Sequence, residues 1–218
     1  MLELFGHPFS SYTWKALIAL YENETPFTFR PLDPEHPDNG AVFFEHWPIG
    51  KFPLLIDQGK PVFESSIIIE HLQLHHPGPV PLVPDEPALA LEVRMLDRIF
   101  DNHVMSPMQR VVADAIKPAA RRDAEDVVQA KAMLDKAYGW LDQWMADWEW
   151  AAAGRFSLAD CAAAPALFYA DWVHPIAETN ARLRAYRARL LARPSIARVV
   201  DEARPYRPLF PLGAPDRD

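Results

Sequence analysis

The stretch GHPFSSYTWKALIAL, residues 6–20, sets the architecture of the N-terminal part of this chain. It follows a short apolar run, Leu2 to Phe5, which ends at a glycine and a nearby proline. From Trp14 onward its apolar residues recur at helical spacing. The pattern predicts a strand, a tight turn and a helix. Two serines, Ser10 and Ser11, stand where that helix begins.

The serine pair has two interpretations. One hydroxyl can cap the helix, because a serine oxygen readily accepts a hydrogen bond from an unpaired N–H group of the first turn. Alternatively, one hydroxyl points away from the helix and activates a molecule bound at the helix N-terminus. The local sequence leaves both interpretations open.

The segments that follow continue a small α/β pattern. FTFRPL, residues 27–32, is typical of a second strand, and a loop rich in proline, aspartate and glycine comes after it. PLLID (53–57) and PVF (61–63) flank a short turn that contains Gly59, which predicts a hairpin. SSIIIEHLQLHH, residues 65–76, predicts a helix that starts with serine. The expected order is β-α-β and then β-β-α.

A proline-rich segment separates this pattern from a second one. Residues 77–87, PGPVPLVPDEP, hold five prolines and predict a semi-rigid linker between domains 1–76 and 88–218.

In the second domain, Ser157 and Asp160 have the spacing of a helix capping box. The proline-rich C-terminal tail is expected to pack over the surface. Beyond the linker every periodic segment is helical, with helices expected near residues 88–116, 121–148, 157–172, 179–191 and 194–203.

Composition argues against several classes of function. The chain has 218 residues, is 50% hydrophobic and carries a net charge of -8. This acidity disfavours a nucleic-acid or anionic-membrane partner, because such partners need a basic face. No apolar run approaches the roughly 20 residues of a membrane span, and the N-terminus lacks the basic leader of a signal peptide. We therefore expect a cytoplasmic protein.

Residues for redox or metal chemistry are sparse. The single cysteine, Cys161, excludes an internal disulfide and a thiolate zinc cluster, and its alanine neighbours predict a buried, inert side chain. His71, His75 and His76 include an i, i+4 pair. No glutamate stands between them, and the segment ends at Pro77. We expect a solvated helix end there and no metal site.

Two features of the first domain point to a bound peptide. Pro53 starts a strand, which suits a cis peptide bond after Phe52 in a turn at a sheet edge. The N–H and C=O groups of Phe52 are then free to pair with an extended peptide. Glu64 and Ser65 precede a helix whose first N–H groups suit a carboxylate. A peptide end that carries an ammonium and a carboxylate matches Glu64 and Ser65 respectively.

Read together, these segments resemble the cytosolic glutathione transferases of the bacterial serine type over nearly the whole chain. FSSYTWKALIAL is similar to the family's S-x-x-x-x-[RK] opening, PIGKFPLL to its N-P-x-G-K-V-P-x-L turn, and ESSIIIEHL to its E-S-x-A-I-x-x-Y-L helix start. RMLDRIFDNHVMSPMQ and FSLADCAAAPAL resemble its second-domain signatures. The resemblance implies an α/β plus all-α fold, with a thioredoxin-like N-terminal domain followed by an all-helical C-terminal domain.

The resemblance also assigns site residues, with glutathione as co-substrate and no metal. Ser10 is expected to activate the thiol, since its spacing to Lys15 matches the opening motif, and Ser11 is the alternative. Glu64 and Ser65 are expected to hold the γ-glutamyl end. The full set expected to bind glutathione is Lys51, Phe52, Pro53, Glu64 and Ser65, with Lys51 on the glycyl carboxylate and Phe52 on the cysteinyl backbone.

The implied activity is conjugation of the glutathione thiolate to a small apolar electrophile by a homodimeric enzyme. Three alternatives stay open: a glutathione-dependent isomerase, suggested by the double serine; a peroxidase; and a glutathione- or partner-binding protein without turnover. Methionines and flat aromatic rings suit an apolar substrate between the domains. The expected electrophile pocket consists of Phe9, Tyr12, Met105, Met108 and Trp172.

The chain departs from the family pattern at several positions. Trp47 stands where asparagine usually precedes the Pro-x-Gly turn, and Phe52 replaces the commoner valine. Both changes reshape the peptide groove without removing its backbone bonds. No cysteine occurs at position 10 or 11, so the disulfide chemistry of cysteine-type members is not expected.

Overall fold

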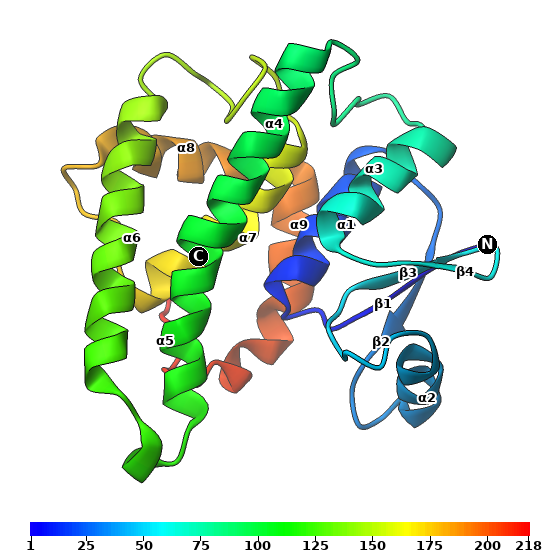
Figure 1. Cartoon of the computed structure of the whole chain (residues 1–218), viewed down its shortest axis with the longest axis horizontal. Helices are drawn as coiled ribbons and strands as arrows, with labels where there is room; N and C mark the ends of the chain where they lie inside the picture. Colours follow the sequence, from blue (N-terminus) through cyan, green and yellow to red (C-terminus); the bar gives the residue numbers. More distant parts are fainter.

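The computed structural model describes residues 1–218, and it begins with a four-stranded mixed sheet in the order β2-β1-β3-β4. The central strand β1 (Leu2–Gly6) pairs in parallel with β2 (Thr28–Pro31) and antiparallel with β3 (Leu54–Asp57). Strand β4 (Lys60–Val62) is antiparallel to β3 at the edge of the sheet. Helices α1 (Ser11–Glu22) and α3 (Ser65–His75) lie between this sheet and a larger set of helices (Figure 1).

The sheet has two apolar faces because side chains alternate along each strand. Leu4 of β1 and Leu55 of β3 belong to the large core that also holds α1 and α3. Phe5 and Leu54, one residue away in each strand, point into a smaller cluster with Phe43. A helix is therefore required on both faces, and the second face is covered by α2 (Pro37–His46).

The α2 helix corrects the loop expected after the second strand. Pro37 occupies the first turn, where the N–H group that proline lacks would have no partner within the helix. Asp38 lies near the N-terminus of the helix, where the helix dipole stabilises a negative charge. Phe43 is the only buried residue of the helix. A single buried residue produces no apolar periodicity, so the proline, aspartate and glycine signals dominated the prediction.

The expected hairpin is confirmed between β3 and β4. Its two central residues, Gln58 and Gly59, have φ values of 49° and 82°. Two positive φ angles give the turn a backbone twist that matches the twist of the strands. Glycine adopts this conformation without steric cost, which explains its place in the turn.

Residues 76–86 contain no helix or strand, and only helices follow. The helix expected over residues 88–116 runs from Pro87 to Ile116 but contains a π-helical segment, Phe100–Met105, between its two α-helical parts. The helix expected over 121–148 begins at Ala124, where Asp123 caps it, and ends at Trp144. The helices are α4 (Pro87–Ile99), α5 (Ser106–Ile116), α6 (Ala124–Trp144), α7 (Leu158–Val173), α8 (Ala181–Leu191) and α9 (Pro194–Ala203).

Helix α7 is the centre of the second domain, and every one of its residues is buried. It is apolar on all sides, as expected for a helix surrounded by others. The predicted capping box is confirmed: Asp160 accepts from the Ser157 N–H at 2.9 Å, and the Ser157 hydroxyl accepts from the first turn. Tyr186 of α8 donates to the same carboxylate at 2.6 Å.

The observed architecture confirms the predicted fold class, an α/β domain followed by an all-helical one.

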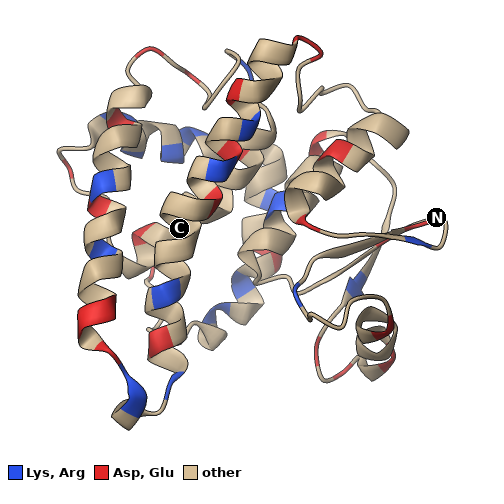
Figure 2. Ribbon diagram, in the orientation of Figure 1, with Lys and Arg blue, Asp and Glu red and all other residues tan.

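Acidic and basic residues alternate along α4 (Figure 2), so this helix presents no basic stripe. Every helix is too short or too polar to traverse a lipid bilayer.

Candidate active site between the two domains

A polar cavity of about 500 Å³ lies where the N-terminal domain meets the helices. It collects residues from four separate parts of the chain: the start of α1, the turn before β3, the start of α3, and the helices from α4 to α5. Its lining consists of Ser10, Tyr12, Gly50, Lys51, Phe52, Pro53, Glu64, Ser65, Arg98, Asp101, Asn102 and Gln109.

One wall of this cavity is unpaired backbone. The Phe52–Pro53 peptide bond is cis, as the sequence predicts. The N–H and C=O groups of Phe52 have no hydrogen-bond partner within the chain, since Phe52 lies outside the strands and makes no turn bond. An extended peptide can use both groups in the manner of an added strand.

A second wall is the start of α3. Glu64 stands immediately before the helix with φ 65° and ψ 118°, a backbone conformation that side-chain-bearing residues rarely adopt. The Glu64 carboxylate has no partner in the chain, and Ser65 is 6% exposed. The first N–H groups of α3 are also unpaired, because intrahelical bonding begins with the bond from Ile68 to Glu64. This end of the cavity therefore offers both a carboxylate and donors for a carboxylate.

The helical domain contributes the opposite wall. Arg98 pairs with Asp97 at 2.7 Å and with Asp101 at 2.6 Å. Lys15, which is 1% exposed, also contacts both aspartates. Burial, opposed by Lys15, raises the pKa of the Asp101 carboxyl. Burial and the nearby Asp101 raise the pKa of Tyr12 to about 12, so its phenol is a hydrogen-bond donor at neutral pH.

An apolar cavity of about 410 Å³ adjoins the polar one. Ser10, Phe52 and Gln109 line both cavities. The remaining lining is largely hydrophobic and includes the end of the C-terminal tail. It consists of His7, Phe9, Ser11, Met108, Val112, Ile116, Tyr169, Leu209, Phe210 and Pro211.

Ser10 is held firmly at the junction of the two cavities. It is the N-cap of α1, and its Oγ accepts from the Thr13 N–H at 3.3 Å. Trp14 donates to the Pro8 carbonyl at 2.6 Å, and Tyr169 of α7 donates to the Phe9 carbonyl at 2.9 Å. These bonds fix the loop that leads into the helix. Because capping uses only the oxygen lone pairs, the hydroxyl proton of Ser10 stays available to a bound group.

Comparisons with known proteins agree with this arrangement. Residues 1–74 match the family model for the glutathione S-transferase N-terminal domain, and residues 100–194 match that for the C-terminal domain. The chain belongs to the glutathione S-transferase family. An uncharacterised glutathione transferase-like protein of Escherichia coli is 27% identical over 67% of this chain and 71% of its own length.

Two further relatives carry different names. A stringent starvation protein A homologue of Coxiella burnetii is 26% identical over 77% of this chain and 75% of its own length. A glutathione S-transferase of Methylobacterium radiotolerans, solved in complex with glutathione sulfonate, is 29% identical with a TM-score of 0.77. That comparison covers 91% of this chain and 94% of the other.

Within this member of the glutathione S-transferase family, the residues expected to bind glutathione lie together. Lys51, Phe52, Pro53, Glu64 and Ser65 all line the polar cavity, with Ser10 beside them. Ser11 lines only the apolar cavity and is 7% exposed.

The residues expected to form the electrophile pocket are divided by the structure. Phe9 and Met108 line the apolar cavity, whereas Tyr12 lines the polar one. Met105 is 1% exposed and belongs to the large hydrophobic core, within the π-helical segment. Trp172 lies behind the cavity lining, with its ring centre 5.1 Å from that of Phe210.

Several lining residues of this glutathione transferase fold were not foreseen from the sequence. Arg98, Asp101 and Gln109 lie within the stretch that resembles a second-domain signature, but that resemblance assigned them no role in the site. Leu209 and Phe210 belong to the C-terminal tail, which Arg217 anchors by donating to the Asp171 carbonyl at 2.9 Å. Cys161 is fully buried, and burial raises the pKa of its thiol well above the ordinary value, so it takes no part in the site.

Proposed function

We propose that this protein is a glutathione transferase that joins the glutathione thiolate to a small apolar electrophile. The observation that carries the proposal is the position of Ser10 in the shared wall of a polar and an apolar cavity. A hydroxyl there can donate to a sulfur in the first cavity while the electrophile approaches from the second. This arrangement brings the two reactants together in one orientation.

The polar cavity offers a partner for each polar part of glutathione. The carboxylate of Glu64 matches the γ-glutamyl ammonium, and the hydroxyl of Ser65 with the free N–H groups of α3 matches its carboxylate. The unpaired Phe52 backbone matches the cysteinyl peptide. Lys51 is the cation that the N-terminal domain contributes to the cavity lining, and it matches the glycyl carboxylate.

Activation of the thiol requires only a modest stabilisation of the thiolate. An ordinary cysteine titrates near ~8.5, and lowering that value by ~2 units needs about 2.7 kcal/mol. A hydrogen bond from Ser10 to the sulfur and the positive end of α1 act together on the same atom. Ionised glutathione is then a nucleophile at neutral pH. Dependence on glutathione also favours the cytoplasm, where that thiol pool is kept reduced.

The test is a screen of purified protein with glutathione against halonitroarenes, isothiocyanates, hydroperoxides and cis-unsaturated acids of the maleyl type. We expect conjugation of at least one apolar electrophile. Turnover should fall by roughly 10² to 10³ in Ser10→Gly, because a donor to the developing negative charge is lost. Glycine is the replacement of choice, since it costs an N-cap only a few tenths of a kcal/mol. Ser11→Gly is the matched control and should keep most activity.

Other outcomes of this screen favour specific alternatives. Turnover confined to the maleyl-type cis acids indicates an isomerase, and turnover confined to hydroperoxides indicates a peroxidase. Similarity to a stringent starvation protein A homologue keeps a binding protein as the second candidate function. Glutathione binding without turnover of any substrate supports that candidate. Absence of glutathione binding contradicts the transferase and leaves only the partner-binding form of the second candidate.

A further inference from the structure

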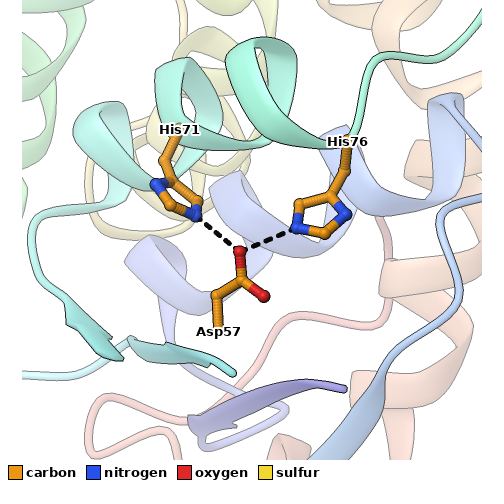
Figure 3. A group of neighbouring side chains, drawn as sticks. All are labelled: Asp57, His71 and His76. Carbon is orange, nitrogen blue, oxygen red and sulfur yellow. Dashed lines mark hydrogen bonds and ion pairs between the residues drawn. The ribbon is translucent and has the colours of Figure 1, made fainter. Parts of the chain in front are cut away.

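Three side chains meet at the far end of α3 from the cavities (Figure 3). Asp57 ends strand β3, His71 lies in the last turns of α3, and His76 follows the helix directly. The Nε2 atoms of His71 and His76 lie 2.9 and 2.7 Å from the same oxygen, Asp57 Oδ2. One ligand atom from each residue falls within 4.8 Å of the others.

This cluster arises from the way the helix ends. Residues four apart share a helix face, so His71 and His75 lie side by side with ring centres 4.4 Å apart and ring planes tilted by 48°. His76 leaves the helix with φ -137° and ψ 55°, and this backbone turn swings its ring back toward the sheet. The i, i+4 pair that the sequence displays is therefore not the pair that reaches Asp57.

The carboxylate of Asp57 is buried and incompletely satisfied. Asp57 is 9% exposed, and its second oxygen, Oδ1, has no hydrogen-bond partner. The hydrogen bond from His76, aided by one from His71, holds the pKa of the Asp57 carboxyl below its usual range. The two imidazoles keep 20% and 29% of their side-chain surface exposed, which leaves an approach from solvent.

We propose that Asp57, His71 and His76 bind a divalent transition metal ion of the zinc class. Two imidazole nitrogens and one carboxylate oxygen suit Zn²⁺, with an open position for water. Zinc–ligand bonds of about 2.0 Å imply ligand atoms about 3.3 Å apart in a tetrahedral site. The Asp57–imidazole spacings of 2.9 and 2.7 Å need widen by only about half an ångström.

Metal binding changes the proton arrangement but not the fold. Each imidazole that donates from Nε2 to Asp57 shifts its proton to Nδ1, on the side of the ring away from the ion, and the freed Nε2 lone pair binds the metal. The ion then ties the end of β3 to the end of α3. Along α3, His71 lies about 9 Å and His76 about 16 Å from Ser65 in the polar cavity, and none of the three proposed ligands lines that cavity.

The experiment measures zinc binding to the full-length protein by calorimetry, with Co²⁺ absorption as a second readout of coordination geometry. The variants are His71→Asn and His76→Asn, which remove one nitrogen ligand each. His75→Asn removes the exposed neighbour, and His36→Asn controls for a surface histidine that pairs with a different aspartate, Asp33. Circular dichroism without metal verifies that each variant is folded.

We expect one zinc per chain, an affinity loss of at least about tenfold in His71→Asn and His76→Asn, and little change in the two controls. Zinc should also raise the melting temperature of the wild type and not that of those two variants, because binding to the native state alone stabilises it. No saturable binding, or equal loss in His75→Asn and His36→Asn, overturns the site. Since no step depends on glutathione, the result is independent of the proposed function.

Discussion

Ser10 shows that the two interpretations of the serine pair are compatible. The side-chain oxygen accepts from the Thr13 N–H and so caps α1, while the hydroxyl proton is free toward the cavities. Ser11 is the first helical residue and faces the apolar cavity only. The proposed activation therefore belongs to the capping serine rather than to its neighbour.

Bound glutathione should reveal this difference through the pKa of its thiol. Removing the hydroxyl in Ser10→Gly should raise that pKa by ~2 units, because the sulfur loses its donor. Thiolate absorbance near ~240 nm follows the titration. Glutathione affinity should hardly change, since the two peptide ends supply most of the binding.

Ser11→Gly and Tyr12→Phe are the controls for that titration. Tyr12 lines the polar cavity as a protonated phenol and is the rival donor. If Tyr12→Phe raises the thiol pKa and Ser10→Gly does not, the phenol is the activating group. If Ser11→Gly does so, the assignment of the serines is reversed.

The γ-glutamyl subsite can be tested separately by calorimetry of glutathione binding. Glu64→Gln and Ser65→Ala should each weaken binding by ~1 to 3 kcal/mol, because a buried charged group of the ligand loses its partner. Glu70→Gln is a suitable comparison, since Glu70 lies on α3 but pairs with Arg94 outside the cavity. Unchanged affinity in both cavity variants contradicts the placement of the ligand.

For individual residues, the sequence predicted those cavity-lining positions that belong to short motifs. Phe52, Pro53, Glu64 and Ser65, which line the polar cavity, could be predicted as a group because each lies in a turn or helix start with its own chemical signature. Asp101 was not found, since its position beside the cavity depends on how α4 packs against α1. The Asp57 cluster was missed for a related reason: it joins a strand end to a residue beyond the end of a helix.

Among the elements, the π-helical segment between α4 and α5 could not be read from apolar spacing. Helical periodicity correctly predicted one long helical segment over residues 88–116. A π-helical turn within it changes which side chains share a face, and the periodicity does not reveal that turn. Met105, which was expected to line a pocket, lies in the π-helical segment and is 1% exposed. The capping box at Ser157 was predictable because its signal is local and complete within four residues.

Helix α7 should give the protein a distinctive pH dependence. Burial raises the pKa of Asp160 to about 6 from 3.8, despite the four hydrogen bonds that its carboxylate accepts. Between about pH 4 and 6 the folded state keeps a proton that the unfolded state has released. Protonated Asp160 therefore adds about 3 kcal/mol to the free energy of unfolding below pH 4. This stabilisation decreases as the pH rises from 4 to 6, and it is lost above pH 6.

Denaturant unfolding of wild type and Asp160→Asn between pH 4 and 7 isolates this contribution, since the other titrating groups are shared. The wild-type stability relative to the variant should decline with rising pH. Tyr186→Phe keeps the titrating carboxyl and should keep the slope. A difference that is flat or rises with pH contradicts the raised pKa.

For the whole molecule, the junction of the two domains is both apolar and charged. Trp14 of α1 lies with its ring centre 4.9 Å from Phe168 and 5.1 Å from Tyr169 of α7. Lys15, the next residue, is buried against Asp97 and Asp101 of the helical domain. Loss of one partner from such a buried group is costly, so the charges fix how the domains meet. The shared cavities require that fixed geometry.

The outer face of α3 and α4 leads to the last prediction, a homodimer. Ile67 and Leu74 of α3 are 53% and 76% exposed, and Leu91 and Met95 of α4 are 67% and 43% exposed. The Arg94–Glu70 ion pair joins α4 to α3, the two helices that carry these side chains. Apolar side chains grouped in this way on a surface favour association with a second copy through a two-fold axis.

Sedimentation at micromolar concentration should give twice the 24.8 kDa of one chain for the wild type. Leu91→Glu and Met95→Glu should shift the protein to monomer, because two like charges then face each other across the axis and apolar contact is lost. Val128→Glu on α6 is the matched control: Val128 is 66% exposed, and α6 lies on the opposite side of the helical domain from α3 (Figure 1). A monomeric wild type refutes the dimer, whereas dissociation by Val128→Glu with retention by Leu91→Glu moves the interface to α6.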